Sequence, residues 1–251
     1  MAIDEALLLH FDPQSSAPVL RLYGWEPAAL SLGRFQKAAE MLDLAEIKRR
    51  ELPLVRRITG GGAIYHADEL TYSIVCSPQQ IPPTNSIKDS FRVLTSFLLR
   101  FYRQLGLAAS FAADAAGEGR TLGGRASFCF AGTESYDILI DGRKIGGNAQ
   151  RRLKQSIFQH GSVPLRLQLE AGLSCLQVKP ERLGEQITCL ETLGVGQGAA
   201  WLAPQLIDCF QQQLGVTLEP GWLTPDEQRC ADALLRDKYS AVSWNLQGEA
   251  S

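Results

Sequence analysis

This sequence has only three histidines in 251 residues and no Cys-x-x-Cys pair. The histidines also lack zinc-finger spacing, so we expect no metal site. No apolar run reaches the roughly 18 residues that a membrane-spanning helix needs. Basic residues number 25 and acidic residues 27, and without a basic excess there is no general nucleic-acid footprint. We therefore expect a protein that binds neither nucleic acid nor a membrane.

Positive charge is missing from the first ten residues, which carry Asp4 and Glu5 where a signal peptide would be basic. This start favours a cytoplasmic protein, in which the six cysteines are free thiols. We expect most of them to be small buried side chains and at most one or two to take part in chemistry. The composition, 45% hydrophobic and 21% charged, is that of an ordinary globular protein. We expect the protein to be a monomer.

Several familiar catalytic motifs are also absent. The segment from Gly142 to Gly147 has the glycine spacing of a phosphate-binding P-loop, but Asn148 stands where that loop needs lysine. There is no G-x-S-x-G, no H-E-x-x-H and no G-x-G-x-x-G after a strand. These absences argue against P-loop NTPases, serine hydrolases, zinc proteases and Rossmann dehydrogenases, although they do not argue against an enzyme.

The pattern of apolar residues predicts strands interspersed with helices. We expect the segments 63–65 and 70–76 to pair around a turn at 67–68, Asp141-Gly142 to turn a hairpin, and 112–124 to form a surface loop. The expected strands are 19–23, 29–32, 54–58, 63–65, 70–76, 136–140, 143–145 and 157–167, and the expected helices are 4–10, 42–51, 86–105, 180–183, 204–214 and 225–239. This order predicts an α+β fold with mixed, mostly antiparallel sheets flanked by helices.

Three consecutive glycines, Gly60 to Gly62, lie between two expected strands and follow Arg56 and Arg57. Glycine lets the main chain approach a ligand closely, and a flanking arginine can hold a carboxylate or phosphate. The same residues are also compatible with a flexible hairpin loop whose arginines are solvated. The pattern alone leaves both interpretations open.

Lys144 and Cys129 are the two candidates for covalent chemistry. Lys144 ends an expected strand and precedes the pair Gly146-Gly147, where an ammonium could stabilise an oxyanion or phosphate. Cys129 lies 15 residues before Lys144 with the Asp141-Gly142 turn between them, and a nearby ammonium would stabilise its thiolate. Taken separately, Lys144 could be an exposed hairpin lysine, and Cys129, between two phenylalanines, a core residue.

Together these segments resemble one superfamily, the biotin/lipoate protein ligases, on its lipoate side. The resemblance covers roughly residues 1 to 168 and is closest to the LipM-type cysteine octanoyltransferases of the lipoate–protein ligase A family. It rests on the opening M-A-x-D-E-A, S-L-G-R-F-Q (31–36), R-R-x-T-G-G-G-A-x-Y-H (56–66), E-L-T-Y-S (69–73), G-R-K-x-G-G-N-A-Q (142–150) and Q-H-G-S (159–162).

The resemblance implies a biotin/lipoate ligase-like catalytic domain that moves an octanoyl group from octanoyl-acyl carrier protein to the lysine of a lipoyl domain or glycine cleavage H protein. It implies that Cys129 is the nucleophile and that Lys144 stabilises the thiolate or oxyanion. Arg57 and His66 are expected to shape the pocket. The substrate-binding residues that it implies are Arg57, Gly60, Gly61, Gly62, Ala63, His66, Gly146, Gly147, Ala149, His160 and Gly161.

Because the motifs extend from the N-terminus to Gln159 around one site, we expect a single catalytic domain over 1–251. Its core would be 1–168, with a helical part, 169–251, packed on it. The Cys-Phe pair before the hairpin, the E-L-T-Y-S segment and the lack of length for an accessory domain favour the transferase, which requires no cofactor.

Other activities remain compatible with the resemblance. The triple glycine is common among lipoate ligases, whereas the transferases usually have Gly-Gly-Arg; a ligase would use ATP and Mg to activate free lipoate as lipoyl-AMP. An octanoyl or lipoyl amidotransferase between lipoyl-domain proteins and a non-catalytic acyl-binding module are further alternatives.

Overall fold

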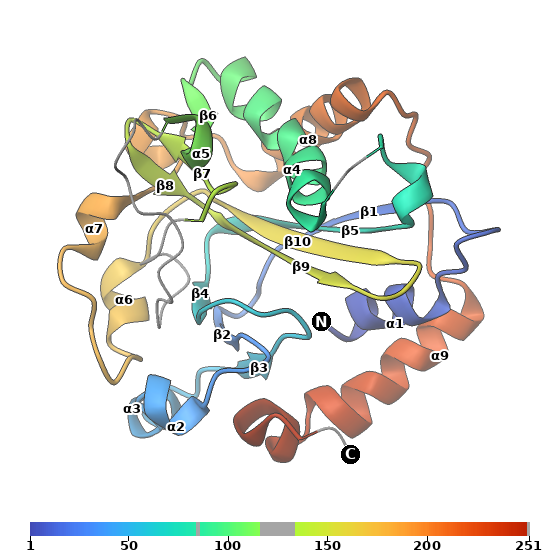
Figure 1. Cartoon of the computed structure of the whole chain (residues 1–251). Coiled ribbons are helices and arrows are strands. Elements are labelled where there is room, and N and C mark those ends of the chain that lie inside the picture. The colour runs from blue at the N-terminus through green and yellow to red at the C-terminus, as the bar shows by residue number, and fades with distance from the viewer. Residues whose placement is uncertain (84–85, 116–133, 250–251) are drawn as a thin grey trace.

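The computed structural model describes residues 1–83, 86–115 and 134–249. Within these ranges the strands form three sheets with helices around them (Figure 1). One four-stranded sheet has the order β1-β5-β10-β9, another has the order β11-β8-β7-β6, and a three-stranded sheet has the order β3-β2-β4. Parallel pairing joins β11 to β8 and β2 to β3, and the other pairs are antiparallel. The prediction of an α+β fold with mixed, mostly antiparallel sheets is confirmed.

The strands are β1 (Val19–Tyr23), β2 (Ala29–Leu32), β3 (Leu54–Arg56), β4 (Ile64–His66), β5 (Glu69–Cys76), β6 (Ala109–Phe111), β7 (Ile138–Ile140), β8 (Arg143–Ile145), β9 (Gly147–Arg152), β10 (Ile157–Pro164) and β11 (Ile187–Thr188). The α-helices are α1 (Ala2–His10), α2 (Ala38–Met41), α3 (Leu44–Arg49), α4 (Ile87–Gln104), α5 (Ala112–Ala115), α6 (Leu169–Leu173), α7 (Leu183–Gln186), α8 (Ala199–Leu214) and α9 (Pro225–Leu234). Shorter helical turns are η1 (Pro78–Gln80), η2 (Glu191–Leu193), η3 (Leu235–Tyr239) and η4 (Ser243–Gln247).

The main core lies between the β1-β5-β10-β9 sheet and helices α4 and α8 (Figure 1). Strands β5 and β10 are buried along their whole length because they occupy the middle of this sheet. Helix α4 presents Leu94, Leu98 and Phe101 to the core at the three-four spacing expected of a buried helical face. Its start is fixed by Ser86, whose hydroxyl accepts a hydrogen bond from the main-chain nitrogen of Asp89.

The Asp141-Gly142 hairpin is confirmed. Both residues have positive φ, 50° and 73°, as a type I′ turn requires. The turn sets the register of β7 against β8, with Leu139 opposite Lys144. This register determines which side chains of the preceding segment lie beside Lys144.

The predicted pairing of the 63–65 and 70–76 segments is wrong. Strand β4 pairs with β2 in the three-stranded sheet, whereas β5 pairs with β1 and β10 in the four-stranded sheet. The intervening residues, 67–68, therefore carry the chain from one sheet to another. Two adjacent apolar runs are typical of a hairpin, but the choice of partner depends on strands distant in the sequence.

Several other boundaries differ from the predictions. The helix expected over 42–51 begins at Leu44, where Asp43 accepts a hydrogen bond from the nitrogen of Glu46, and the short α2 before it was not predicted. The expected loop 112–124 begins instead with α5, and its residues after 115 lie outside the described ranges. Helix α7 begins at the residue where the 180–183 helix was expected to end, and α8 begins five residues before Pro204.

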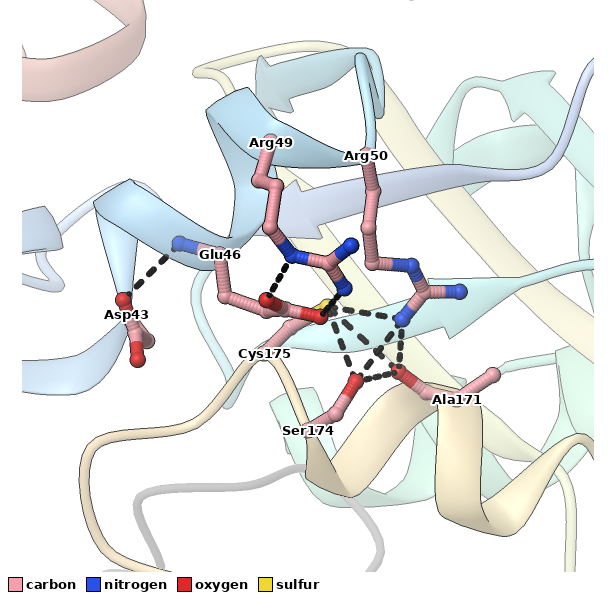
Figure 2. Close-up of polar contacts among 7 residues, drawn as sticks. All are labelled: Asp43, Glu46, Arg49, Arg50, Ala171, Ser174 and Cys175. Carbon is pink, nitrogen blue, oxygen red and sulfur yellow. Dashed lines mark hydrogen bonds and ion pairs between the residues drawn. The ribbon is translucent and has the colours of Figure 1, made fainter.

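A half-buried arginine, Arg50, links the end of α3 to α6 (Figure 2). The guanidinium of Arg50 donates hydrogen bonds to the carbonyl oxygen of Ala171, at 2.9 Å, and to the hydroxyl of Ser174, at 2.7 Å. The Cys175 sulfur lies 3.6 Å from the same guanidinium nitrogen and is fully buried. Cys175 is thus a packed structural thiol, as predicted for most of the cysteines.

The C-terminal helices lie against the N-terminal part of the chain. Helix α9 runs beside α1, and η4 contacts β3 (Figure 1). Trp244 is fully buried in a cluster with Leu7, Leu8 and Phe158, so this cluster joins the two ends of the described chain. No helix in the described ranges is both long and apolar enough to cross a membrane.

Candidate active site

Arg57 holds the glycine loop in place. Its side chain is almost completely buried, and its guanidinium donates hydrogen bonds to the carbonyl oxygens of Gly60, at 3.2 Å, and Gly62, at 2.8 Å. The other terminal nitrogen donates to the carbonyl oxygen of Ser31 at 3.1 Å and to its hydroxyl at 2.6 Å. Charge-assisted hydrogen bonds of this kind fix a loop whose glycines would otherwise leave it flexible. Arg57 is therefore not solvated, which excludes one of the two interpretations left open by its sequence pattern.

The glycine loop also packs against the segment that contains Gly33. A Cβ atom on Gly33 would lie only 1.9 Å from the carbonyl oxygen of Gly61, so the two segments are in direct main-chain contact. Gly61 has a φ of 98°, a conformation that favours glycine. Gly33 and Gly61 thus allow the two segments to pack against each other without a side chain between them.

His66 lies in a buried hydrogen-bond network. Its Nε2 atom is 2.6 Å from the hydroxyl oxygen of Ser31, and its Nδ1 atom is 2.9 Å from a carboxylate oxygen of Glu69. Because Arg57 already donates to Ser31, the hydroxyl can give its own proton to Nε2, and the Nδ1–H group is then the donor to Glu69. The imidazole also stacks on Trp25, with ring centres 4.0 Å apart. These contacts hold the ring rigidly.

His160 is buried and uncharged. Its Nε2 atom lies 2.7 Å from the hydroxyl oxygen of Thr59. Burial, reinforced by the positive charge of Arg57, lowers the pKa of His160 from 6.5 to about 3. The imidazole therefore presents a neutral surface at physiological pH.

These elements surround a cavity between the β1-β5-β10-β9 sheet and strand β4 of the three-stranded sheet. Of the predicted binding residues, those that line it are Arg57, His66, Gly147, Ala149, His160 and Gly161. The lining also contains residues that the sequence analysis did not select, namely Met1, Tyr23, Trp25, Ile64, Thr71, Asn148 and Ser162. Met1, Thr71, Asn148 and Ser162 could have been found, because all four belong to the motifs that carried the resemblance.

The remaining predicted binding residues lie around the cavity and do not contribute to its lining. Gly60 and Gly62 are the carbonyl acceptors of Arg57, Gly61 contacts Gly33, and Ala63 is buried in the neighbouring core cluster. Gly146 makes the corner between β8 and β9 with a φ of 70°, and a Cβ there would lie 2.1 Å from the carbonyl oxygen of Ser162. Their contacts position the walls of the cavity.

Lys144 forms a buried ion pair. Its ammonium lies 2.7 Å from a carboxylate oxygen of Asp137, and both side chains are almost fully buried. The same carboxylate oxygen accepts a hydrogen bond from the main-chain nitrogen of Glu134. Lys144 is thus not an exposed hairpin lysine, and it does not belong to the cavity lining.

The sequence analysis missed Asp137, although a signal for it existed. The Asp141-Gly142 turn places Leu139 opposite Lys144. Side chains alternate along a strand, so the residue two positions before Leu139 is a diagonal neighbour of Lys144 on the same face. That residue is Asp137.

The predicted nucleophile, Cys129, lies outside the described residues. The five described cysteines, Cys76, Cys175, Cys189, Cys209 and Cys230, are free thiols, and none of the five lines the cavity. Burial raises the pKa of Cys76 to about 12 and also raises those of Cys209 and Cys230. These three thiols are held in the protonated, unreactive form at neutral pH.

Comparison with known proteins connects this arrangement to a family. A family model described as the lipoyl protein ligase A/B catalytic domain matches residues 1–211. The chain belongs to this family. The resemblance drawn from the motifs is therefore confirmed, and the matched residues include every predicted site residue.

Curated relatives of this lipoyl protein ligase A/B family member extend over almost its entire length. Octanoyltransferase LipM of Kyrpidia tusciae is 35% identical, with 98% of this chain and 93% of the relative covered. Octanoyltransferase LipM of an Exiguobacterium species is 36% identical, with 97% of this chain and 92% of the relative covered.

Solved structures of lipoate ligases share the fold. A lipoate-protein ligase A bound with ATP has a TM-score of 0.82 and 27% identity, with 99% of this chain and 93% of that chain covered. A bi-partite lipoate protein ligase from Thermoplasma acidophilum has a TM-score of 0.81 and 26% identity, with 100% and 91% covered.

Proposed function

We propose that this chain is an octanoyltransferase of lipoate biosynthesis. It would take the octanoyl group from octanoyl-acyl carrier protein and transfer it to the acceptor lysine of a lipoyl domain or of glycine cleavage H protein. The observation that carries the proposal is the near full-length similarity to curated relatives named Octanoyltransferase LipM. The activity expected from the sequence motifs is the same.

The character of the cavity lining suits an acyl substrate. Its walls include the main chain at Gly147 and Gly161, the small side chain of Ala149 and the apolar side chain of Ile64. His160 adds no charge, because its lowered pKa keeps the imidazole neutral. An aliphatic chain can be buried against such a surface without desolvating a charged histidine.

The proposed reaction proceeds through two acyl exchanges. Cys129 gives up its thiol proton, its thiolate attacks the carbonyl carbon of the octanoyl thioester, the bond to the donor sulfur breaks, and the departing donor thiolate takes up that proton. The amine of the acceptor lysine then attacks the Cys129 thioester, forms an amide and releases the cysteine. Because an acyl group is exchanged at each step, the transfer consumes no ATP and requires no metal.

Lys144 would supply the positive charge of this site. An ammonium near the reacting atoms stabilises a thiolate and the oxyanion that forms during attack. The ion pair with Asp137 fixes the position of the Lys144 ammonium. Asp137 is therefore a positioning residue for the lysine in this proposal.

Intact-mass measurement after incubation with octanoyl-acyl carrier protein tests the mechanism. Wild type should gain one octanoyl group that hydroxylamine removes, and Cys129→Ala should gain none. Cys230→Ala is the matched control, since it removes another thiol that lies outside the cavity, and it should react like wild type. The mechanism is wrong if Cys129→Ala still octanoylates a lipoyl domain at a rate near that of wild type.

The ligase activity is the second candidate, because the similar solved structures include a lipoate-protein ligase A bound with ATP. Transfer of free lipoate that depends on ATP and Mg and releases pyrophosphate would establish it. Transfer from an octanoylated lipoyl-domain protein, without use of the acyl carrier protein, would establish an amidotransferase. Acyl binding with no turnover from any of these donors would identify a binding module.

A further inference from the structure

Four polar residues of the sequence motifs have no role in the mechanism above. Tyr72 lies on β5, Asn148 and Gln150 lie on β9, and Gln159 lies on β10, which is the strand between β5 and β9. The register places Gln150 opposite Gln159 and Asn148 opposite Gly161. These side chains form one hydrogen-bond chain beneath α4, and the chain ends at the cavity.

The direction of each hydrogen bond in this chain follows from the number of protons available. Gln150 donates its amide to the Gln159 oxygen at 3.0 Å, so the Gln159 nitrogen is the donor to the Tyr72 hydroxyl oxygen, at 3.3 Å. That nitrogen also donates to the hydroxyl of Thr95, at 3.0 Å. The single proton of Tyr72 is then free to be donated to the side-chain oxygen of Asn148, at 2.7 Å. Burial raises the pKa of Tyr72 well above its usual value, which keeps the hydroxyl protonated.

This network fixes the orientation of the Asn148 amide. Its oxygen is committed to Tyr72, so its nitrogen cannot take that place without setting two donors against each other. In the part of the chain that the structure describes, the Asn148 side-chain nitrogen has no hydrogen-bond partner, and Asn148 lines the cavity. The result is an oriented N–H donor at the wall of the proposed acyl site.

The position of Asn148 along the chain matters as well. The Gly146 corner separates it from Lys144, so the two donors come from different sheets and flank the same turn. Asn148 also faces Gly161, where the absence of a side chain gives the amide room to reach Tyr72. The asparagine is therefore held by main-chain geometry on one side and by Tyr72 on the other.

We propose that the Asn148 side-chain nitrogen donates a hydrogen bond to the carbonyl oxygen of the acyl group and that Tyr72 is the positioning residue for this donor. When a nucleophile bonds to the carbonyl carbon, an electron pair moves onto the oxygen, and the hydrogen bond strengthens with that charge. The pair returns as the bond to the leaving group breaks, and the leaving group departs with a proton; Asn148 itself transfers none. The identity of the acyl donor rests on the proposed function.

Single-turnover acyl transfer by wild type, Asn148→Ala, Asn148→Asp and Tyr72→Phe tests the proposal, alongside the dissociation constant of a non-reactive octanoyl amide. Loss of an oxyanion donor lowers the rate by about 10²–10³-fold. We expect this loss of rate for both Asn148 variants, while their affinity for the octanoyl amide should stay within a few-fold of that of wild type. Tyr72→Phe should lower the transfer rate by about tenfold. Gln104→Glu makes the same amide-to-carboxylate change at an exposed position of α4 and should retain the wild-type rate.

A double variant separates a catalytic role from a structural one. Because Tyr72 acts only through Asn148, Tyr72→Phe/Asn148→Ala should be no slower than Asn148→Ala alone. The proposal is overturned if Asn148→Ala transfers the acyl group at a rate within threefold of that of wild type. It is also overturned if the rate losses of the two single variants multiply in the double variant, or if the variants lose only affinity for the octanoyl amide. If wild type fails with octanoyl-acyl carrier protein but acts as a ligase, the proposed function is wrong and the same variants are measured in the ligase reaction, which has the same acyl carbonyl.

Discussion

At the scale of single residues, the glycines of the site differ sharply in what surrounds them. A Cβ on Gly161 would lie 2.1 Å from the side-chain oxygen of Asn148 and 2.7 Å from a ring carbon of Tyr72. A Cβ on Gly221 would meet nothing within 4 Å. Sequence motifs mark Gly161 as important, but the structure supplies the reason, which is the close approach of two neighbouring side chains.

We predict that Gly161→Ala lowers the free energy of unfolding by about 1–3 kcal/mol, the usual range for overpacking. It should also reduce acyl transfer strongly, because the added methyl displaces the Asn148 amide. Urea unfolding and single-turnover kinetics measure the two effects. Gly221→Ala is the control and should match wild type in both; a Gly161→Ala protein as stable and as active as wild type would contradict the packing described here.

His160 gives the site a defined response to acid. The unfolded chain binds a proton at this histidine below pH 6.5, whereas the folded protein does so only near pH 3. Stability associated with the neutral imidazole is therefore complete above pH 6.5 and is lost as the pH falls from 6.5 toward 3. We predict that the free energy of unfolding falls by about 1 kcal/mol per pH unit more steeply in wild type than in His160→Asn over this window. Urea unfolding between pH 7 and pH 4 measures both slopes, and equal slopes would show that the imidazole is not held neutral.

At the scale of elements, the C-terminal turn η4 is connected to the site by a buried arginine. Arg56 donates hydrogen bonds to the carbonyl oxygens of Trp244 and Leu246 in η4 and of Gly33 in the loop that contacts Gly61. It also donates to two further carbonyl oxygens of that loop, those of Arg34 and Gln36. The five acceptors are main-chain oxygens, so this cation is stabilised by peptide dipoles.

We predict that Arg56→Lys lowers the free energy of unfolding by about 2–3 kcal/mol, because an ammonium has three donors and cannot reach five oxygens spread around a planar guanidinium. Arg49→Lys, at an exposed position on α3, should change it by less than about 0.5 kcal/mol. Urea unfolding of the two variants measures both changes in the free energy of unfolding. Similar small changes in both would mean that the carbonyl contacts of Arg56 contribute little.

At the scale of the whole molecule, the two ends of the described chain share one apolar cluster. Leu7 and Leu8 of α1, Phe158 of β10 and Trp244 of η4 are all buried in it. The last helical turn of the segment after 168 therefore shares this cluster with strand β10 of the four-stranded sheet. The single-domain arrangement over 1–251 remains a prediction.

We predict one cooperative thermal transition for the full chain, with a calorimetric enthalpy equal to the van 't Hoff enthalpy. The physical reason is that removal of the C-terminal helices would expose α1 and β10, so neither part can unfold alone without cost to the other. Differential scanning calorimetry measures this ratio. Two separate transitions, or an enthalpy ratio well above one, would show that the helical part unfolds independently.

The sequence by itself determined the features that depend on neighbouring residues. These include the turn at Asp141-Gly142, the apolar face of α4, and the motifs that predicted the family and the residues of its site. Their physical basis is local, because dihedral preferences, capping and side-chain periodicity act within a few residues.

Only the tertiary structure decided which distant groups meet. It placed β4 and β5 in different sheets, paired Lys144 with Asp137, buried Arg57 among main-chain carbonyls and oriented Asn148 through Tyr72. Each of these contacts depends on sheet register and on the packing of segments far apart in the chain, which periodicity does not encode. Six residues of the cavity lining were therefore predicted from the sequence, whereas the other lining residues, and the partners and orientations of all of them, were set by the fold.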